Sequence, residues 1–165
     1  MELTFRSYLA EDLEQMRAMW NEILEDGNAF PGDELLTQET FPEMLRQQTA
    51  VNCMLLDQKL VGFYILHPNN IGRCGHVANA SYALDKSVRG MHLGRHLVSH
   101  CLDAAKKEGF RGLQFNAVVA SNLPALHIYQ ELGFQTVGTI PGGYRLKDGT
   151  YSDMFILYLP LIDEC

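Results

Sequence analysis

Residues 84–95 read LDKSVRGMHLGR and join a stretch typical of a β-strand, residues 76–84, to a helix predicted at residues 94–108. A loop of this kind is a common anion site, because the first N–H groups of a helix are free and glycine lets a ligand approach the backbone. The loop matches neither GxxxxGK[ST] nor GxGxxG, so motif support for a nucleoside triphosphate or a dinucleotide is lacking. Taken alone, the loop could also be a plain strand–helix connection.

A second block, residues 122–134, reads NLPALHIYQELGF and follows another predicted strand. Asn122 is expected to cap a short helix over residues 123–132 that ends at Gly133. Ala125 and Tyr129 are four residues apart and therefore share one helix face. A small residue below a tyrosine leaves a groove with a phenol above it.

Hydrophobic periodicity places the other elements around these two blocks. Strands are expected at residues 2–8, 51–57, 60–67, 76–84, 113–119, 135–140 and 151–159, and helices at residues 10–26, 40–48, 94–108 and 123–132. This order predicts an α/β (α+β) fold with one domain over residues 1–165. We expect a mixed, mostly antiparallel sheet of six or seven strands, flanked on both sides by about four helices.

Together the two blocks resemble the GCN5-related N-acetyltransferase (GNAT) superfamily. The family's acetyl-CoA loop, [Q/R]-x-x-G-x-[G/A], is matched by Arg89 and Gly94, with His92 in place of the middle glycine. The family block N-x-x-A-x-x-x-Y-x-x-x-G-F is matched at every named position of residues 122–134. The order of the predicted elements also fits, so the resemblance covers nearly the whole chain.

The resemblance implies acetyl-CoA as co-substrate and no metal. Its diphosphate is expected on the backbone N–H groups of residues 89–95, and its pantetheine arm between residues 82–84 and 113–119. Tyr129 is expected to protonate the departing thiolate, while backbone N–H groups near Leu84 stabilise the oxyanion. The residues expected to bind the cofactor are Ala83, Leu84, Arg89, Gly90, His92, Leu93, Gly94, Arg95, Asn122, Ala125 and Tyr129.

The acceptor amine is predicted from the strand VANASYAL, residues 77–84, which has no carboxylate where many members of the superfamily place a basic glutamate. Asn79 lies there and Asn116 in a neighbouring strand. Together with Asn122 and the string ANASYA at residues 78–83, they resemble the fungal azetidine-2-carboxylate (proline-analogue) N-acetyltransferases. This resemblance implies a small amino acid whose amine or carboxylate is held by Asn79 and Asn116. Asn79 is thus assigned to the catalytic residues with Tyr129. The alternative is that Asn79 forms a bulge and Asn116 is an ordinary polar strand residue.

Phe30 and Tyr64 are further candidates for the substrate mouth, with core packing as the alternative for each. Three functions follow from these residues. The first is acetyl transfer to the amine of a small molecule, with an amino acid or a proline analogue as the candidate. The second is a protein N-terminal or antibiotic (phosphinothricin-type) acetyltransferase, favoured by an acidic mouth at residues 11–43. The third is a non-catalytic acyl-CoA-binding module.

Composition limits the partners. The 165 residues have a net charge of −7, with 12 acidic and 4 basic residues in residues 1–72 but 8 acidic and 9 basic in residues 73–165. An anion is therefore expected to bind the second half, and a nucleic-acid platform is not expected. The chain has no apolar run long enough for a membrane span. A cytoplasmic location follows as an expectation, and the resemblance implies a homodimer.

Two further residue patterns could suggest a metal site but are interpreted as structural. The four cysteines are too widely spaced for a zinc site and are predicted to be small buried thiols in a reducing compartment; they are Cys53, Cys74, Cys101 and Cys165. His92, His96 and His100 recur every four residues, opposite the apolar side of their helix. They are predicted to form a solvated face and no metal site.

Overall fold

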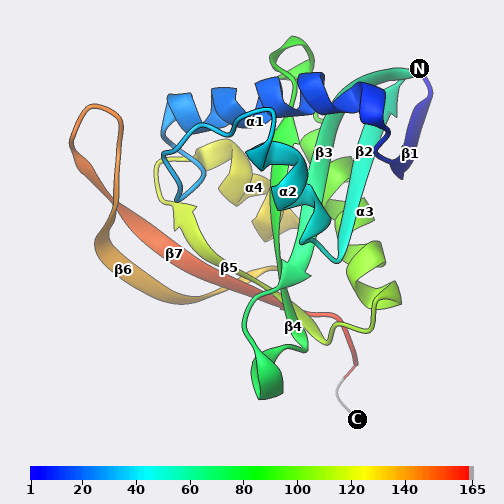
Figure 1. Cartoon of the computed structure of the whole chain (residues 1–165). Helices are drawn as coiled ribbons and strands as arrows, with labels where there is room; N and C mark the ends of the chain where they lie inside the picture. Colours follow the sequence, from blue (N-terminus) through cyan, green and yellow to red (C-terminus); the bar gives the residue numbers. More distant parts are fainter. Residues whose placement is uncertain (164–165) are drawn as a thin grey trace.

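The computed structural model describes residues 1–163, which contain seven strands and four α-helices (Figure 1). The strands are β1 Leu3–Ser7, β2 Ala50–Leu56, β3 Lys59–Pro68, β4 Val77–Leu84, β5 Gly112–Val119, β6 Gln135–Arg145 and β7 Tyr151–Pro160. The α-helices are α1 Leu13–Asp26, α2 Thr40–Arg46, α3 Gly94–Lys107 and α4 Leu123–Glu131. Three 3-10 helices join them: η1 Ala10–Asp12, η2 Gly72–Cys74 and η3 Lys86–Val88.

One mixed sheet holds these strands in the order β1-β2-β3-β4-β5-β7-β6. Its neighbouring strands are antiparallel except β4 and β5, which are parallel. The predicted fold class and element order are therefore confirmed.

The helices cover the two faces of the sheet in pairs, because each presents an apolar side to it. α1 and α2 pack on one face through Met16, Trp20 and Phe41. α3 packs on the other face through Leu97 and Cys101, and Figure 1 shows α3 and α4 together behind the sheet. Each face thus has its own apolar cluster.

The cysteines among the described residues are free thiols, as predicted. Cys53 and Cys101 are fully buried, one in each apolar cluster. Burial raises the pKa of both thiols to about 12, so they stay protonated at neutral pH. Cys74 is exposed in η2, so the prediction of a buried thiol is wrong there, and Cys165 lies outside the described residues.

β4 and β5 separate soon after they meet, and this opening positions the site. They pair through two residue pairs only, the second being Ala78 with Leu113. Figure 1 shows β5 then running away from β4. β5 also bulges between Phe115 and Val118 in its pairing with β7, and a bulge bends a strand and re-aims its side chains. The facing edges of two central strands are thereby open to a ligand.

β6 is longer than predicted. The sequence suggests a strand that ends at residue 140 and a glycine-rich turn after it, but the strand continues to Arg145 through a bulge between Ile140 and Tyr144. Gly142 adopts a positive φ of 60° there, and its N–H donates to the Asp153 carboxylate at 3.0 Å. Because β6 lies at the edge of the sheet, the proline at position 141 is tolerated.

The turn between β2 and β3 lies one residue earlier than predicted. Asp57 and Gln58 occupy it with positive φ angles of 49° and 68°, as in a type I′ hairpin turn. The Asp57 N–H donates to the Glu2 carbonyl and the Asp57 carboxylate accepts the Glu2 N–H, both at 2.8 Å. These bonds hold Asp57 outside the β2–β3 ladder.

Candidate active site

A cavity of about 330 Å³ lies in the opening between β4 and β5. Its walls come from the loop after α1, from β4 and β5, and from the first turns of α3 and α4. Among the described residues, those that line it include no Asp, Glu, Lys, Arg or His. The walls are therefore suited to an uncharged arm, with any charge of a ligand placed at the ends of the cavity.

Tyr129 projects from α4 into an aromatic cluster on one wall of this cavity. Its ring centroid lies 4.5 Å from that of Phe115, 5.6 Å from that of Phe134 and 6.5 Å from that of Tyr82. Burial raises the pKa of the Tyr129 hydroxyl above its usual range. The hydroxyl is therefore protonated at neutral pH and can act as a proton donor.

The start of α4 is built as the sequence predicts. The Asn122 side-chain oxygen accepts the Ala125 N–H at 3.4 Å, and Pro124 occupies the first turn of the helix. Asn122, Ala125 and Tyr129 line the same cavity. Because the cap uses the oxygen of Asn122, its amide N–H groups are left to face a ligand.

The loop between β4 and α3 presents backbone N–H groups. Within residues 1–163, the N–H groups of Gly90, His92 and Leu93 donate to no backbone carbonyl. The first turn of α3 adds further N–H groups that an α-helix leaves without an internal partner. The macrodipole of the helix favours negative charge at this end. The loop and the helix together can therefore hold a diphosphate.

The loop departs from the acetyl-CoA pattern at His92 and agrees with it at Gly94, and the structure explains both. His92 replaces the middle glycine and adopts a left-handed conformation with φ of 59°, which histidine tolerates better than most side chains. Gly94 packs closely against α4, because a Cβ there would lie 3.0 Å from the Cδ1 atom of Ile128. The glycine thus lets α3 and α4 approach each other beside the loop.

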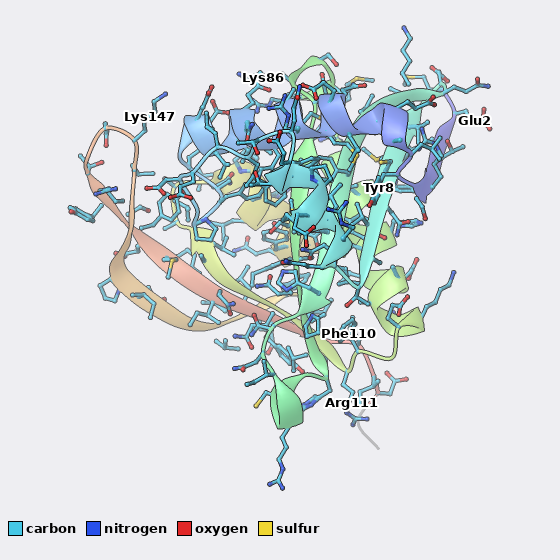
Figure 2. The ribbon with its side chains drawn as sticks, viewed as in Figure 1. Glu2, Tyr8, Lys86, Phe110, Arg111 and Lys147 are labelled. Atoms are coloured by element: carbon cyan, nitrogen blue, oxygen red, sulfur yellow. The ribbon has the colours of Figure 1, made fainter. Side chains whose placement is uncertain are left out.

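Ion pairs tie this loop to neighbouring helices. Lys86 of η3 pairs with Glu22 of α1, and Figure 2 shows Lys86 above that helix. The Arg89 guanidinium lies 3.5 Å from the Asp26 carboxylate at the end of α1. α1 therefore supports the loop, and its acidic residues are neutralised there.

Three asparagine side chains meet where β4 and β5 begin to separate. The Asn69 oxygen accepts the Asn79 amide at 3.2 Å and the Asn116 amide at 2.6 Å. The Asn79 oxygen accepts the Ala80 N–H at 2.7 Å, and the Asn116 oxygen accepts the Gln114 amide at 2.9 Å. We call Asn69, Asn79 and Asn116 the amide triad.

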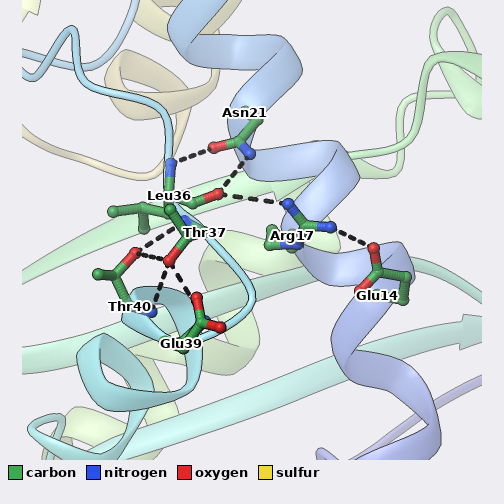
Figure 3. Close-up of polar contacts among 7 residues, drawn as sticks. All are labelled: Glu14, Arg17, Asn21, Leu36, Thr37, Glu39 and Thr40. Atoms are coloured by element: carbon green, nitrogen blue, oxygen red, sulfur yellow. Dashed lines mark hydrogen bonds and ion pairs between the residues drawn. The ribbon is translucent and has the colours of Figure 1, made fainter.

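The loop between α1 and α2 forms the remaining wall. Phe30 lines the cavity while its ring packs on Trp20, with 4.4 Å between the centroids. Farther along, the Asn21 side chain donates to the Leu36 carbonyl at 2.9 Å and accepts the Leu36 N–H at 2.8 Å (Figure 3). The loop is thus fixed to α1 at both of these points.

The cavity brings together predicted residues from five separate segments. They are Phe30, Asn79, Leu84, Gly94, Asn116, Asn122, Ala125 and Tyr129. The other predicted loop residues lie beside it, where Arg95 pairs with Glu131 at 3.0 Å. Ala83 does not line the cavity, because it is buried at 1% exposure in the apolar cluster under α1 and α2.

Tyr64 is the predicted substrate residue that the structure does not bring to the cavity. It is fully buried, and its hydroxyl accepts the Asn52 amide at 2.7 Å and lies 2.8 Å from His100 Nδ1. The His100 ring stacks on Phe5 at 4.0 Å, and burial lowers the pKa of His100. The prediction that His100 belongs to a solvated face is therefore wrong, although His92 and His96 are exposed.

Asn69 is the site residue that sequence reasoning missed. It lies in the segment PNN, residues 68–70, which indicates only a turn. Its position becomes clear once the backbone is folded, since the Asn69 N–H donates to the Val77 carbonyl at 2.8 Å and places the loop beside β4. The one available signal was that Asn69 directly follows β3, the strand that pairs with β4 and therefore lies beside Asn79.

The described residues contain no group of three or more His, Cys, Asp or Glu side chains placed to hold a metal ion. Over the same residues, none of the helices combines the length and the apolar character that crossing a membrane requires.

Comparisons with known proteins agree with this geometry. N-acetyltransferase aca1 of Schizosaccharomyces pombe is 34% identical over 98 residues, which are 59% of this chain and 47% of that protein. The chain spans about half or less of the length of the curated relatives that it matches. A GCN5-related N-acetyltransferase from Kribbella flavida superposes with a TM-score of 0.89 at 29% identity, covering 96% of this chain and 97% of that one.

A GNAT superfamily phosphinothricin acetyltransferase from Sinorhizobium meliloti, solved in complex with AcCoA, has the same fold. Its TM-score is 0.88 at 18% identity, over 97% of this chain and 89% of that one. The family model described as Acetyltransferase (GNAT) family matches residues 13–134. These residues include both blocks that carry the resemblance and most of the cavity, and the chain belongs to the acetyltransferase (GNAT) family.

Proposed function

We propose that the chain is an acetyl-CoA-dependent N-acetyltransferase that acts on the amine of a small amino acid or proline analogue. The observation that carries this proposal is the amide triad: Asn79 and Asn116 line the same neutral cavity as Tyr129, and both donate to Asn69 beside it. A donor-rich acceptor site and a protonated phenol on one cavity are what acetyl transfer to an amino acid requires.

The fit to acetyl-CoA rests on the two ends of the cavity. The free N–H groups of Gly90, His92 and Leu93 would hold the diphosphate, with the start of α3 behind them. The uncharged walls suit the pantetheine arm, and the open edges of β4 and β5 offer it backbone partners. Asn122 would donate to the arm before it reaches Tyr129.

Transfer is direct, in a ternary complex. The amine nitrogen forms a bond to the thioester carbonyl carbon, backbone N–H groups near Leu84 stabilise the oxyanion, and the carbon–sulfur bond then breaks. Tyr129 gives its proton to the leaving sulfur and is reprotonated by the proton that the nitrogen releases. Within the described chain, no carboxylate or histidine lines the cavity. Either a water molecule accepts the proton of the amine, or the amine binds already deprotonated and needs no base.

The preference for a carboxylate comes from the hydrogen bonds that the amide triad already makes. The oxygens of Asn69, Asn79 and Asn116 each accept a hydrogen bond. Each amide nitrogen carries two hydrogens, so every member keeps at least one N–H to donate. A set of free donors binds an acceptor, and a carboxylate is the strongest acceptor that a small amine commonly carries.

A cationic peptide fits less well. An acidic mouth built from residues 11–43 would favour such an acceptor, but several of these carboxylates pair with Arg or Lys, and none lines the cavity. Phosphinothricin is the second candidate, because its amino-acid end would meet the same donors of the amide triad. A non-catalytic acyl-CoA-binding module is disfavoured by Tyr129, whose position on the cavity has no structural need for a hydroxyl.

A radiolabelled acetyl-CoA assay over a panel of amines separates these functions. We expect transfer to proline analogues and small amino acids, and little transfer to polyamines or peptide N-termini. Transfer to phosphinothricin alone would favour the second candidate. Binding of acetyl-CoA without transfer to any amine would contradict an enzymatic function.

Changing Asn69 to Asp is expected to raise the KM for the amino acid at least about tenfold. The substitution removes two N–H donors and places a negative charge beside the acceptor carboxylate, and a lost charge-assisted hydrogen bond has an effect of about this size. The KM for acetyl-CoA should stay within twofold. Steady-state kinetics with each substrate varied in turn measures both values.

The matched control is Asn70→Asp, which adds the same charge one residue away. The Asn70 side-chain oxygen accepts the Ile71 N–H at 2.8 Å, and aspartate keeps that bond. An equal rise of KM in both variants would mean that the charge acts at long range and would remove Asn69 from the acceptor site.

We also propose a homodimer through β6, the edge strand of 11 residues. Val137 is 60% exposed and Ile140 43% exposed on this strand, and a long edge with apolar side chains is a ready partner for another strand. Val137→Lys is expected to shift the protein from dimer to monomer in sedimentation velocity. A monomeric parent protein would contradict the proposal.

The reduced, buried thiols of Cys53 and Cys101 support a cytoplasmic location.

A further inference from the structure

Tyr144 of β6 reaches across to the loop that closes the acceptor side of the cavity. Its hydroxyl donates to the Phe30 carbonyl at 2.6 Å, although the two residues are 114 positions apart in sequence. Tyr144 is 8% exposed, and the bond is partly buried. Its length lies at the short end of the usual range for a hydrogen bond between two oxygens.

A second contact supports the same loop from the same hairpin. Gly27 ends α1 with φ of 64°, and a Cβ there would lie 3.2 Å from the Cβ of Lys147. Lys147 lies in the turn between β6 and β7, which Figure 2 shows beside the end of α1. The loop after α1 therefore rests on the β6–β7 hairpin at Gly27 and at Phe30.

The Phe30 carbonyl is an effective point at which to hold this loop. It belongs to the peptide plane that joins Phe30 to Pro31, and both residues line the cavity. The residue before a proline is confined to extended conformations, so fixing the orientation of this plane leaves the pair little freedom. The far end of the loop is already held by Asn21 at Leu36 (Figure 3).

We propose that Tyr144 is a positioning residue that sets acceptor selectivity by holding the Phe30–Pro31 wall in place. The inference rests on the proposed function, because it takes the cavity next to this wall as the acceptor site. Tyr144 itself does not line the cavity, so its hydroxyl acts through the Phe30 carbonyl. It limits how far the wall can move outward, and so limits the size of the amine that fits.

Changing Tyr144 to Phe removes the hydrogen bond and keeps the ring. We expect the KM for a small amino acid to rise about two- to tenfold, the worth of one hydrogen bond, and the preference for small over bulky amines to fall by a similar factor. The KM for acetyl-CoA and the turnover at saturation should change less than twofold. Tyr151→Phe is the control, because Tyr151 is 69% exposed on the same hairpin and lies outside the cavity lining.

Trp20 supplies a readout that does not depend on activity. It is the only tryptophan in the chain, and its ring packs on Phe30. Its emission should change in Tyr144→Phe and not in Tyr151→Phe, and amide hydrogen exchange over residues 27–31 should become faster. Unchanged selectivity, emission and exchange in Tyr144→Phe would overturn the inference. A parent protein that acetylates no amine would refute the proposed function, while emission and exchange would still decide whether Tyr144 holds the wall.

Discussion

Tyr129→Phe is expected to lower turnover about 100-fold or more, the usual contribution of one acid–base group. The substitution removes only the hydroxyl, and the ring keeps its contacts with Phe115 and Phe134. The leaving sulfur must then depart without a proton donor. Rapid-quench or steady-state assays with saturating acetyl-CoA measure the loss, and the Kd for acetyl-CoA should change little.

The pH profile gives a second test of the same residue. Burial raises the pKa of Tyr129, so its hydroxyl stays protonated as pH rises through the neutral range. Turnover of the parent protein should therefore not decline between about pH 7 and pH 9 through loss of this proton. Tyr151→Phe is the matched control for removing a tyrosine hydroxyl, since Tyr151 is exposed outside the cavity. Equal turnover in the Tyr129→Phe and Tyr151→Phe variants would remove Tyr129 from the chemistry.

His92→Glu is expected to weaken acetyl-CoA binding at least about tenfold. His92 lies exposed in the loop whose free N–H groups we propose to hold the diphosphate. A carboxylate within about 5 Å of a phosphate near the protein surface is unfavourable by at least about 1.4 kcal/mol, which is a factor of ten in Kd. Isothermal calorimetry at two salt concentrations measures the change, and the difference should shrink at high salt.

His92→Gly is the control for changing this backbone position. His92 adopts φ of 59°, a conformation that glycine reaches without strain, so the variant should bind acetyl-CoA as tightly as the parent or more tightly. If the Glu and Gly variants bind equally well, the loop does not hold the diphosphate.

Local sequence signals predicted those parts of the molecule that are determined locally. The apolar spacing of α3, the cap at Asn122 and the shared face of Ala125 and Tyr129 depend on neighbouring residues, and all appear as predicted. The loop before α3 was also placed correctly, although the left-handed conformation of His92 follows only from the folded backbone.

The parts that were missed depend on contacts between distant segments. β3 is buried on both faces over most of its length, so alternation could not show that Tyr64 faces α3 instead of the cavity. His100 is covered because Phe5 stacks on it from β1. Asn69 joins the site through Asn79 and Asn116, which the sheet brings beside its loop.

The ends of β6 illustrate the same limit. Pro141 and the two glycines that follow it suggest a turn, but they form a bulge within β6. A proline is tolerated there because β6 is an edge strand, where the missing N–H does not break the pairing of the sheet. The longer strand brings Tyr144 to Phe30, and no local pattern indicates a bond between those two residues.

A titration of the ¹⁵N-labelled protein with acetyl-CoA, followed by amide NMR, tests directly whether the loop and the cavity bind this molecule. We predict saturable shifts at one molecule per chain, largest at the N–H groups of Gly90, His92 and Leu93 and next at residues 122–129. No shifts at millimolar acetyl-CoA, or shifts confined to other parts of the chain, would contradict the account.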